Sequence, residues 1–478
     1  MLTARSPLLK DWTIGPALGW GLVALICVLV AADGGLGALT RLITEAPTAP
    51  ASAGPTFVAS GEGAPEDVAP ALPPRPDLTA EPRAAGGGSG APPEAVPGKT
   101  VEDTCVEPLG ATTGCKRWAM DGFYRALAAS EGGKAARATR VSFYGDSVSA
   151  TDALPGRVRA RLQDVFGDGG PGFIHAVKPH RFNHTEVVDR TSSGSWKTWG
   201  VSLVNVSDHL YGVGNSTAEG SGSIRMSLKS AAAAFSKVDV YYLAQPGGGS
   251  AAVTVGDTTT TIDTAAAAKS ARFQQIAVPD GGHAVQLQSS GGRVRLFGFA
   301  LERDTGIVVD NMALVSATAK NMLVNLADHW KNQLSHREAD LIIIMLGTNE
   351  AQWLAGATAM AEYEKTWEEL LAPVRAGRPN ASCLVMSPLD QAEAKDGKLV
   401  SRRGVPKMVA AQRKAAQVAG CAYWDTFTWM GGSGAAITWN RKGLLGSDFA
   451  HMSRRGTAKV ADGLADALFN GYKAYKGR

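Results

Sequence analysis

Three short motifs carry side chains suited to nucleophilic catalysis. Ser147 lies in the motif GDSV at residues 145–148, and a serine hydroxyl becomes an effective nucleophile only when a nearby base takes its proton. The motif DFAH at residues 448–451 supplies such a base. In a helix-like turn, Asp448 and His451 face the same side, so the carboxylate can accept from one ring nitrogen while the other nitrogen faces the serine.

The third motif, GTNE at residues 347–350, directly follows the most apolar run of the chain. The Asn349 amide could donate a hydrogen bond to the oxyanion that develops when a carbonyl is attacked. Alone, each motif is weak, because such sequences are common in turns and helix caps. Their order and placement favour a joint site. A metal site built from Asp146, Asp448 and His451 is disfavoured, because it offers one imidazole and no close second ligand group.

Alternating strands and helices must position these motifs. The predicted strands cover residues 140–144, 307–309, 341–346, 383–386 and 422–424, and the predicted helices cover residues 155–166, 318–333, 358–375, 405–418 and 454–472. Apolar strands that alternate with helices indicate a mainly parallel sheet covered on both faces. Such sheets place their sites at the C-terminal ends of strands, where the motifs at 145–148 and 347–350 lie.

Residues 175–305 break this rhythm. Short alternating runs at residues 238–242, 284–288 and 294–297 are separated by turn clusters at 246–249 and 280–282. This pattern predicts an antiparallel β-sandwich inserted into the α/β domain. The alanine-rich piece at 265–269 fits either a loop or a short helix. Trp196 and Trp199 could stack on sugar rings, although tryptophans near strands are more often core residues.

The N-terminal segment indicates the compartment. Arg5 and Lys10 precede an apolar run at residues 16–32, and acidic residues follow it. This charge order is typical of a segment inserted with its N-terminus in the cytoplasm. We therefore expect residues 1–34 to form a transmembrane anchor, with a cleaved signal segment as the alternative. The rest of the chain is then expected on the periplasmic or extracellular side of the cell envelope.

Composition divides the remaining chain. Residues 45–100 hold 12 of the 24 prolines and almost no aromatic residues, which predicts a disordered linker over residues 35–100. The formal charge of +4 is spread without a long basic run, so nothing indicates a nucleic-acid partner. Cys105 and Cys115 are close enough in sequence for a local disulfide. The other cysteines, Cys27, Cys383 and Cys421, are expected to be buried small hydrophobes.

Together the motifs resemble the SGNH (GDSL-like) hydrolase family. The GDSV motif matches the family's first block with Ser147 as nucleophile, and GTNE matches the third with Asn349 as oxyanion donor. The last block corresponds to Asp448 and His451. This resemblance covers about residues 139–174 and 306–470. It implies a flavodoxin-like three-layer α/β/α domain made of residues 101–174 and 306–478, interrupted by the insert at 175–305. No Gly-x-Ser-x-Gly elbow surrounds Ser147, which argues against an ordinary α/β-hydrolase.

The second block departs from the family pattern. It normally supplies a glycine whose backbone N–H joins the oxyanion hole, and the matching stretch at residues 310–317 has Ala313 and Ser316 where glycines are expected. The backbone N–H is still present when alanine or serine replaces glycine. We therefore expect Ser316 to complete an oxyanion hole with the N–H of Ser147 and with Asn349, and Ala313 is the next candidate. Glu350 also stands where the family often has aspartate.

The architecture resembles bacterial peptidoglycan O-acetylesterases, in which an SGNH domain is combined with a carbohydrate-module-like sandwich. The resemblance implies a serine esterase that removes acyl groups, above all O-acetyl, from an acylated glycan such as peptidoglycan. It implies no metal and no organic cofactor. The chain is expected to contact the membrane through its N-terminal segment. A lipase, a thioesterase or an acetyltransferase would use the same residues, and a non-catalytic glycan-binding envelope protein is the alternative from another class.

Overall fold

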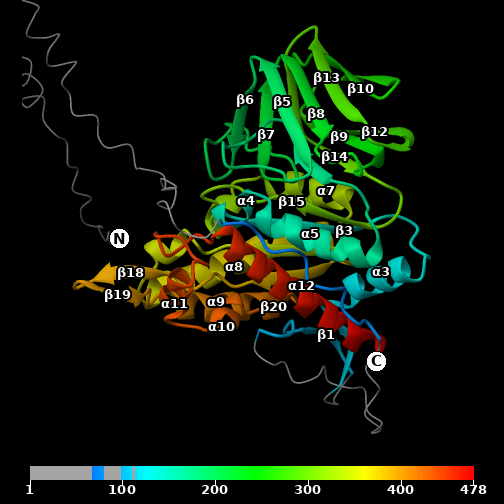
Figure 1. Ribbon diagram of the computed structural model, residues 1–478. Coiled ribbons are helices and arrows are strands. Elements are labelled where there is room, and N and C mark those ends of the chain that lie inside the picture. Colours follow the sequence, from blue (N-terminus) through cyan, green and yellow to red (C-terminus); the bar gives the residue numbers. More distant parts are fainter. Residues whose placement is uncertain (1–66, 80–97, 110–113) are drawn as a thin grey trace, which may run out of the picture. The chain divides into compact units, whose positions relative to one another are not determined.

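A computed structural model of the 478-residue chain describes residues 67–79, 98–109 and 114–478 (Figure 1). The predicted anchor at residues 1–34, Cys27 and most of the predicted linker lie outside the described residues. In the part of the chain that is described, no helix has the length and apolar character needed to cross a membrane.

The central sheet is parallel, as the sequence predicts. Its five strands follow the order β15-β3-β16-β17-β20, and every neighbouring pair is parallel. The strands are β15 (Ile307–Asn311), β3 (Thr139–Gly145), β16 (Leu341–Met345), β17 (Ser382–Met386) and β20 (Ala422–Trp424). Four of them are buried along their whole length, and β15 except at its last residue. Continuous apolar runs are expected for strands covered on both faces.

Helices cover both faces of this sheet. Alternate residues of a strand point to opposite faces, and in β16 Ile343 belongs to one hydrophobic cluster while Ile342 and Ile344 belong to another. The first cluster includes residues of α3 (Asp121–Glu131), α5 (Ala153–Phe166) and α12 (Arg454–Lys476). The second includes residues of α7 (Ala327–Arg337), α8 (Ala357–Gly377) and α9 (Val405–Val418). The sheet is therefore the middle layer of an α/β/α arrangement.

The single helix predicted at residues 318–333 is wrong. The chain instead forms α6 (Ala319–Met322) and then α7, with a break between them. At the break, the Leu326 N–H donates to the carbonyl of His209, at 3.2 Å, instead of to the preceding helical turn. The buried Asn325 donates from Nδ2 to Asn215 Oδ1, at 2.9 Å. Both partners lie in the inserted region, so tertiary contacts interrupt a helix that local periodicity favours.

Residues 172–302 build two additional antiparallel sheets. One has the order β11-β10-β13-β8-β5, and the other has the order β12-β9-β14-β7-β6 with β4 also paired to β14 (Figure 1). The first contains β5 (Val188–Gly194), β8 (Gly222–Leu228), β10 (Ser250–Val255), β11 (Thr258–Asp263) and β13 (Ala284–Ser290). The second contains β4 (Gly172–His175), β6 (Lys197–Gly200), β7 (Ser216–Gly220), β9 (Phe235–Ala244), β12 (Ser270–Gly281) and β14 (Val294–Glu302). Side chains of both sheets share one hydrophobic cluster.

Details of this region differ from the sequence-based prediction. The alanine-rich piece at 265–269 is a loop, and β12 extends through Asp280 and Gly281 with an irregular register where a turn was predicted. Trp196 and Trp199 are half-buried and pack against two hydrophobic clusters, which favours their structural interpretation.

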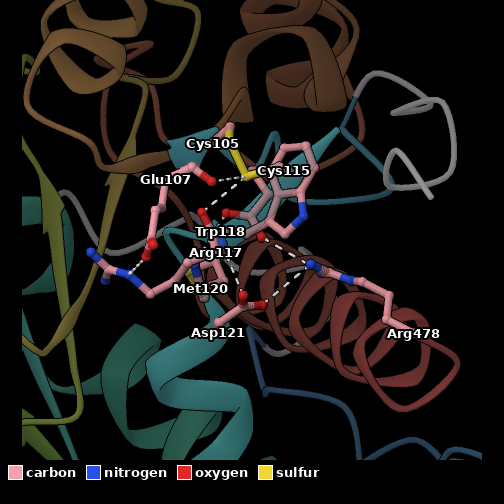
Figure 2. The surroundings of a disulfide bond; sticks show 9 residues. Cys105, Glu107, Cys115, Arg117, Trp118, Met120, Asp121 and Arg478 are labelled. Carbon is pink, nitrogen blue, oxygen red and sulfur yellow. Dashed lines mark hydrogen bonds and ion pairs between the residues drawn. A yellow bond between two sulfur atoms is a disulfide. The ribbon is translucent and has the colours of Figure 1, made fainter. Parts of the chain in front are cut away.

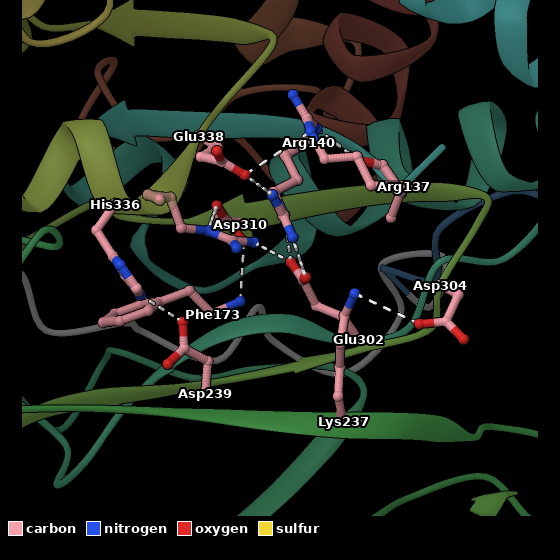
Figure 3. Close-up of polar contacts among 12 residues, drawn as sticks. Arg137, Arg140, Phe173, Lys237, Asp239, Glu302, Asp304, Asp310, His336 and Glu338 are labelled. Atoms are coloured by element: carbon pink, nitrogen blue, oxygen red, sulfur yellow. Dashed lines mark hydrogen bonds and ion pairs between the residues drawn. The ribbon is translucent and has the colours of Figure 1, made fainter. Parts of the chain in front are cut away.

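A buried network of charges joins this region to the central sheet (Figure 3). Arg140 of β3 donates to Glu302 of β14, with Nη2 and Oε2 2.8 Å apart. Arg337 of α7 contacts Glu302 at 2.7 Å and donates to Asp310 of β15 at 2.7 and 2.8 Å. Burial would raise the pKa of Glu302, but the two arginines outweigh it and hold the pKa at about 2. All four groups are paired, as buried charges must be.

Two disulfides stabilise the α/β part. Cys105 of β1 (Cys105–Pro108) is bonded to Cys115 of β2 (Cys115–Trp118), which confirms the predicted local bridge (Figure 2). The interpretation of Cys383 and Cys421 as unbonded small hydrophobes is wrong, because they form the second disulfide. Both are buried. Cys383 lies in β17 and Cys421 directly precedes the neighbouring β20, so sheet pairing brings together residues that are 38 apart in sequence.

Part of the predicted linker lies against the domain. The buried Arg157 of α5 donates to the carbonyls of Pro70 and Ala71, at 2.7 and 2.9 Å. Asp67 accepts from the first backbone N–H groups of α12, a favourable position for a carboxylate. Disorder was predicted throughout residues 35–100 from composition; within the described residues 67–79, Asp67 and the carbonyls of Pro70 and Ala71 have hydrogen-bond partners in α12 and α5.

Candidate active site

The strand β3 ends at Gly145, and after Asp146 the short helix α4 (Ser147–Ala150) begins at Ser147. The buried Asp146 caps this helix, since its Oδ1 accepts from the Val148 N–H at 3.0 Å. Its other oxygen accepts from the Thr348 N–H at 3.2 Å. Asp146 therefore ties the first motif to the third. Gly145 is needed here because an added Cβ would meet the Ser149 side chain at 2.9 Å.

His451 lies between Ser147 and Asp448. Its Nε2 is 2.7 Å from the Ser147 Oγ, and its Nδ1 is 2.7 Å from the Asp448 Oδ2. The other oxygen of Asp448 accepts from the backbone N–H groups of Ala450 and His451, which holds the carboxylate in a tight turn before α12. The two residues face the same side through this turn, and no helix forms over residues 448–451.

The electrostatics suit a serine–histidine pair. The hydrogen bond to Asp448 raises the pKa of His451 above its ordinary value of 6.5, in spite of partial burial. Burial would raise the pKa of Asp448, but hydrogen bonds from His451 and the backbone outweigh it and lower the pKa to about 2. Asp448 is thus a carboxylate that can stabilise the imidazolium formed when His451 takes the serine proton.

Asn349 and Glu350 connect the third motif to the second block. Asn349 donates from Nδ2 to the carbonyl of Ala317 at 2.8 Å, which uses one of its two amide hydrogens and leaves the other for a ligand. The buried Glu350 accepts from the Ala319 N–H at 2.9 Å. Burial raises the pKa of Glu350 to about 7.

Ser316 has a backbone that favours glycine. Its φ is +63°, in the left-handed region, and its side chain is exposed. This conformation is a physical reason for a glycine at this position. The N–H groups of Ser316 and Ser147 donate to no other group among the described residues. The N–H of the buried Ala313 donates to Asn311 Oδ1, at 3.1 Å, so the alternative oxyanion donor is already engaged.

Two residues of the inserted region donate hydrogen bonds to backbone carbonyls of the second block. The sequence did not predict these contacts. Asn183 donates from Nδ2 to the carbonyl of Ala313, and Ser202 donates from Oγ to the carbonyl of Val315, both at 2.8 Å. Asn183 is buried and Ser202 is half-buried. Neither residue belongs to a motif, and polar residues in loops are too common to be singled out from sequence.

Within residues 67–79, 98–109 and 114–478, no group of three or more His, Cys, Asp or Glu residues could hold a metal ion. Of the three residues considered as metal ligands, Asp146 accepts backbone hydrogen bonds and the other two bind each other.

Comparison with protein families matches residues 213–459 to the GDSL-like lipase/acylhydrolase family. The match spans just over half of the chain and includes Ser316, Asn349, Asp448 and His451, while Ser147 precedes it. The chain therefore belongs to the GDSL-like lipase/acylhydrolase family, and it is a serine esterase with an SGNH hydrolase fold. Comparison with curated proteins found no match.

Among solved structures, a peptidoglycan O-acetylesterase matches with a TM-score of 0.62 and 22% identity, over 73% of this chain and 95% of that chain. An acetyl xylan esterase, AlAXEase, matches with a TM-score of 0.26 and 16% identity, over 34% of this chain and 79% of its own. A family two carbohydrate esterase from Cellvibrio japonicus has a TM-score of 0.25 and 12% identity, over 60% of this chain and 98% of its own. The likeness to the peptidoglycan O-acetylesterase supports a fold shared with that protein.

Proposed function

We propose that the protein is an exported serine esterase that removes O-acetyl groups from a cell-wall or other extracellular glycan. The observation that carries the proposal is the continuous hydrogen-bonded series from Ser147 through His451 to Asp448. Free N–H groups of Ser147 and Ser316 and the second amide hydrogen of Asn349 accompany it. This combination is the one that acyl transfer through a serine requires.

In the proposed mechanism, His451 takes the Ser147 proton as the Ser147 Oγ attacks the ester carbonyl. The N–H groups of Ser147 and Ser316 and the Asn349 amide donate to the resulting oxyanion. His451 then protonates the sugar oxygen as its bond to the acyl carbon breaks, which leaves an acetyl group on Ser147. A water molecule, deprotonated by His451, attacks the acyl carbon; the bond to the Ser147 Oγ then breaks, His451 returns the proton to that oxygen, and acetate is released. Asp448 keeps the imidazole oriented throughout.

Two observations support the glycan and the compartment. A solved structure that aligns with 73% of this chain is that of a peptidoglycan O-acetylesterase. The two disulfides, Cys105–Cys115 and Cys383–Cys421, are typical of proteins in an oxidising compartment, which agrees with export. We further propose that residues 175–305 are a sandwich-type module inserted between residues 101–174 and 306–478 of the hydrolase domain, and that residues 1–34 anchor the chain in the membrane.

Ester selectivity tests this proposal. The purified protein should hydrolyse p-nitrophenyl acetate faster than p-nitrophenyl octanoate and should release acetate from O-acetylated peptidoglycan. Ser147→Ala is the matched control and should release none. Preference for octanoyl or longer esters would instead indicate a lipase or thioesterase. Acetyl transfer to an added sugar, in place of acetate release, would indicate a transferase that uses the same acyl-enzyme.

A further inference from the structure

A small cavity lies where three parts of the active-site framework meet. Asp152 follows α4, Asn311 ends β15 at the start of the second block, and His175, Asn183 and Arg190 belong to the inserted region. All five line the cavity, whose volume is about 20 Å³. A space of roughly 10–15 Å³ is enough for one water-sized group. The cavity therefore accommodates one heavy atom with its hydrogens.

Four of the residues that line this cavity each carry one polar atom without a hydrogen-bond partner. These atoms are Asp152 Oδ1, His175 Nε2, Asn183 Oδ1 and Arg190 Nε, all shielded from solvent. The Asp152, His175 and Asn183 side chains are more than nine-tenths buried, at 0%, 5% and 4% exposed. Buried polar atoms are nearly always paired, so unpaired atoms gathered around one space indicate a ligand there.

The remaining atoms of these side chains are engaged, which fixes their orientation. Asp152 Oδ2 accepts from Arg159, and His175 Nδ1 is 2.7 Å from the Ser216 Oγ. Asn183 Nδ2 donates to the Ala313 carbonyl, and Arg190 donates from Nη1 to the carbonyl of His175. The four free atoms consequently cannot turn away to other partners without breaking these bonds.

The free atoms demand a ligand that both donates and accepts. Asp152 Oδ1 and Asn183 Oδ1 are acceptors, and Arg190 Nε is a donor. Burial lowers the pKa of His175 to about 3, so its ring is neutral and Nε2 matches either role. An anion would meet the Asp152 carboxylate, and a cation would meet Arg190. A hydroxyl oxygen satisfies both kinds of partner.

We propose that this cavity is a binding site for one hydroxyl-type oxygen, supplied either by water or by a hydroxyl group of the glycan. Exposed His184 and half-buried Thr185 line the same cavity, so its mouth reaches solvent. Asn183 also holds Ala313, and Asn311 donates to the carbonyl of Ser149, so a bound oxygen lies next to both the oxyanion loop and the nucleophile helix. Binding of a glycan hydroxyl at this site rests on the proposed function, whereas binding of a water molecule does not.

A high-resolution crystal structure of the full-length protein tests the site, determined alone and after soaking with tri-N-acetylchitotriose. The expected result is an oxygen peak within hydrogen-bond distance of Asn183 Oδ1, Asp152 Oδ1 and Arg190 Nε. A peak in both crystals assigns water, and a peak continuous with sugar density assigns a glycan hydroxyl. A cavity without any oxygen peak in both crystals would overturn the proposal.

Kinetics of His175→Phe separate the two sources further, because phenylalanine places a ring edge where Nε2 lies. Ser216→Ala is the matched control, since it removes the other hydrogen bond of His175 and retains the imidazole with its Nε2. If a glycan hydroxyl binds, kcat/KM of His175→Phe on O-acetylated peptidoglycan should fall about tenfold, the loss expected for one hydrogen bond. The fall in its kcat/KM on p-nitrophenyl acetate, which carries no sugar, should be smaller. Equal effects on both substrates would exclude the glycan source.

Fluorophosphonate labelling of Ser147 distinguishes a failure of the proposed esterase mechanism from a failure of the proposed cavity site. Labelling together with an oxygen-free cavity would reject the cavity site alone. An oxygen in the cavity of a protein that takes no label would reject the esterase mechanism and would leave the water site standing.

Discussion

The parallel sheet and the inserted antiparallel sheets contribute to the site in different ways. The ends of β3 and β16 and the turn before α12 carry Ser147, Asn349 and His451, so the α/β part provides the groups that would react. The inserted region provides no such group. It contributes Asn183 and Ser202, which hold carbonyls of the loop that carries Ser316. The reacting groups can be recognised in the sequence from their residue types. The residues that position the loop can be recognised only from their contacts in the structure.

The largest effect should come from the reacting groups of the α/β part. Ser147→Ala and His451→Ala should each lower kcat by a factor on the order of 10³ or more, because nucleophile and base act as one unit. The double variant should be no worse than either single variant. Steady-state hydrolysis of p-nitrophenyl acetate measures this, and additive losses would contradict the shared role.

Loss of the proposed oxyanion donor should have the next largest effect. Asn349→Ala should lower kcat by about 10² to 10³ and leave KM nearly unchanged, because the donor acts on charge that appears in the transition state. Circular dichroism should first confirm folding, since Asn349 also holds the Ala317 carbonyl. A change in KM alone would make Asn349 a substrate-binding residue instead.

These assignments show how far sequence alone leads. The parallel sheet was predictable because apolar strands are local signals. The approach of Ser147 to His451, 304 residues apart, was expected from the order and placement of the motifs and from the family resemblance. The helix break at Leu326 and the hydrogen bond from Asn183 to the second block could not be predicted, since both depend on specific contacts between segments more than 100 residues apart. The disulfide Cys383–Cys421 was missed for a similar reason, because strand pairing alone brings its cysteines together.

The disulfides stabilise the α/β part, and their removal should leave the chemistry intact. Replacing Cys383 and Cys421 by alanine opens a closed loop of 38 residues and should lower the free energy of unfolding by about 4 kcal/mol. The matched Cys105→Ala/Cys115→Ala variant opens a loop of 10 residues and should cost roughly 3 kcal/mol. Urea titration measures both. A large drop in kcat of the folded variants would show that the bridges also shape the site.

A smaller catalytic effect is expected from the inserted region. Ser202→Ala removes the hydrogen bond to the Val315 carbonyl and should lower kcat up to about tenfold with KM unchanged, since the loop carrying Ser316 becomes less well held. Ser195→Ala, which loses only exposed hydrogen bonds to the hydroxyl and the backbone N–H of Ser221, is the control and should have parental kinetics. If the two variants behaved alike, the insert would not position the oxyanion loop.

The smallest change should be a shift in pH dependence. His451 must be unprotonated to act as base, and Asp448 raises its pKa above 6.5, so kcat/KM should rise with pH through a midpoint above that value. Asp448→Asn removes the negative acceptor and should move the midpoint to lower pH. Initial rates on p-nitrophenyl acetate from about pH 5 to 9 measure this. An unchanged midpoint would mean that Asp448 does not act on His451.

Covalent labelling tests the central claim, that Ser147 is a nucleophile activated by His451, most directly. The full-length protein should react with a fluorophosphonate probe at one site, and peptide mass spectrometry should locate the adduct on Ser147. Ser147→Ala should take no label, and His451→Ala should label far more slowly while still folded. Absence of label on the parent protein, or equal labelling of Ser147→Ala, would contradict the account and would favour a glycan-binding protein without this chemistry.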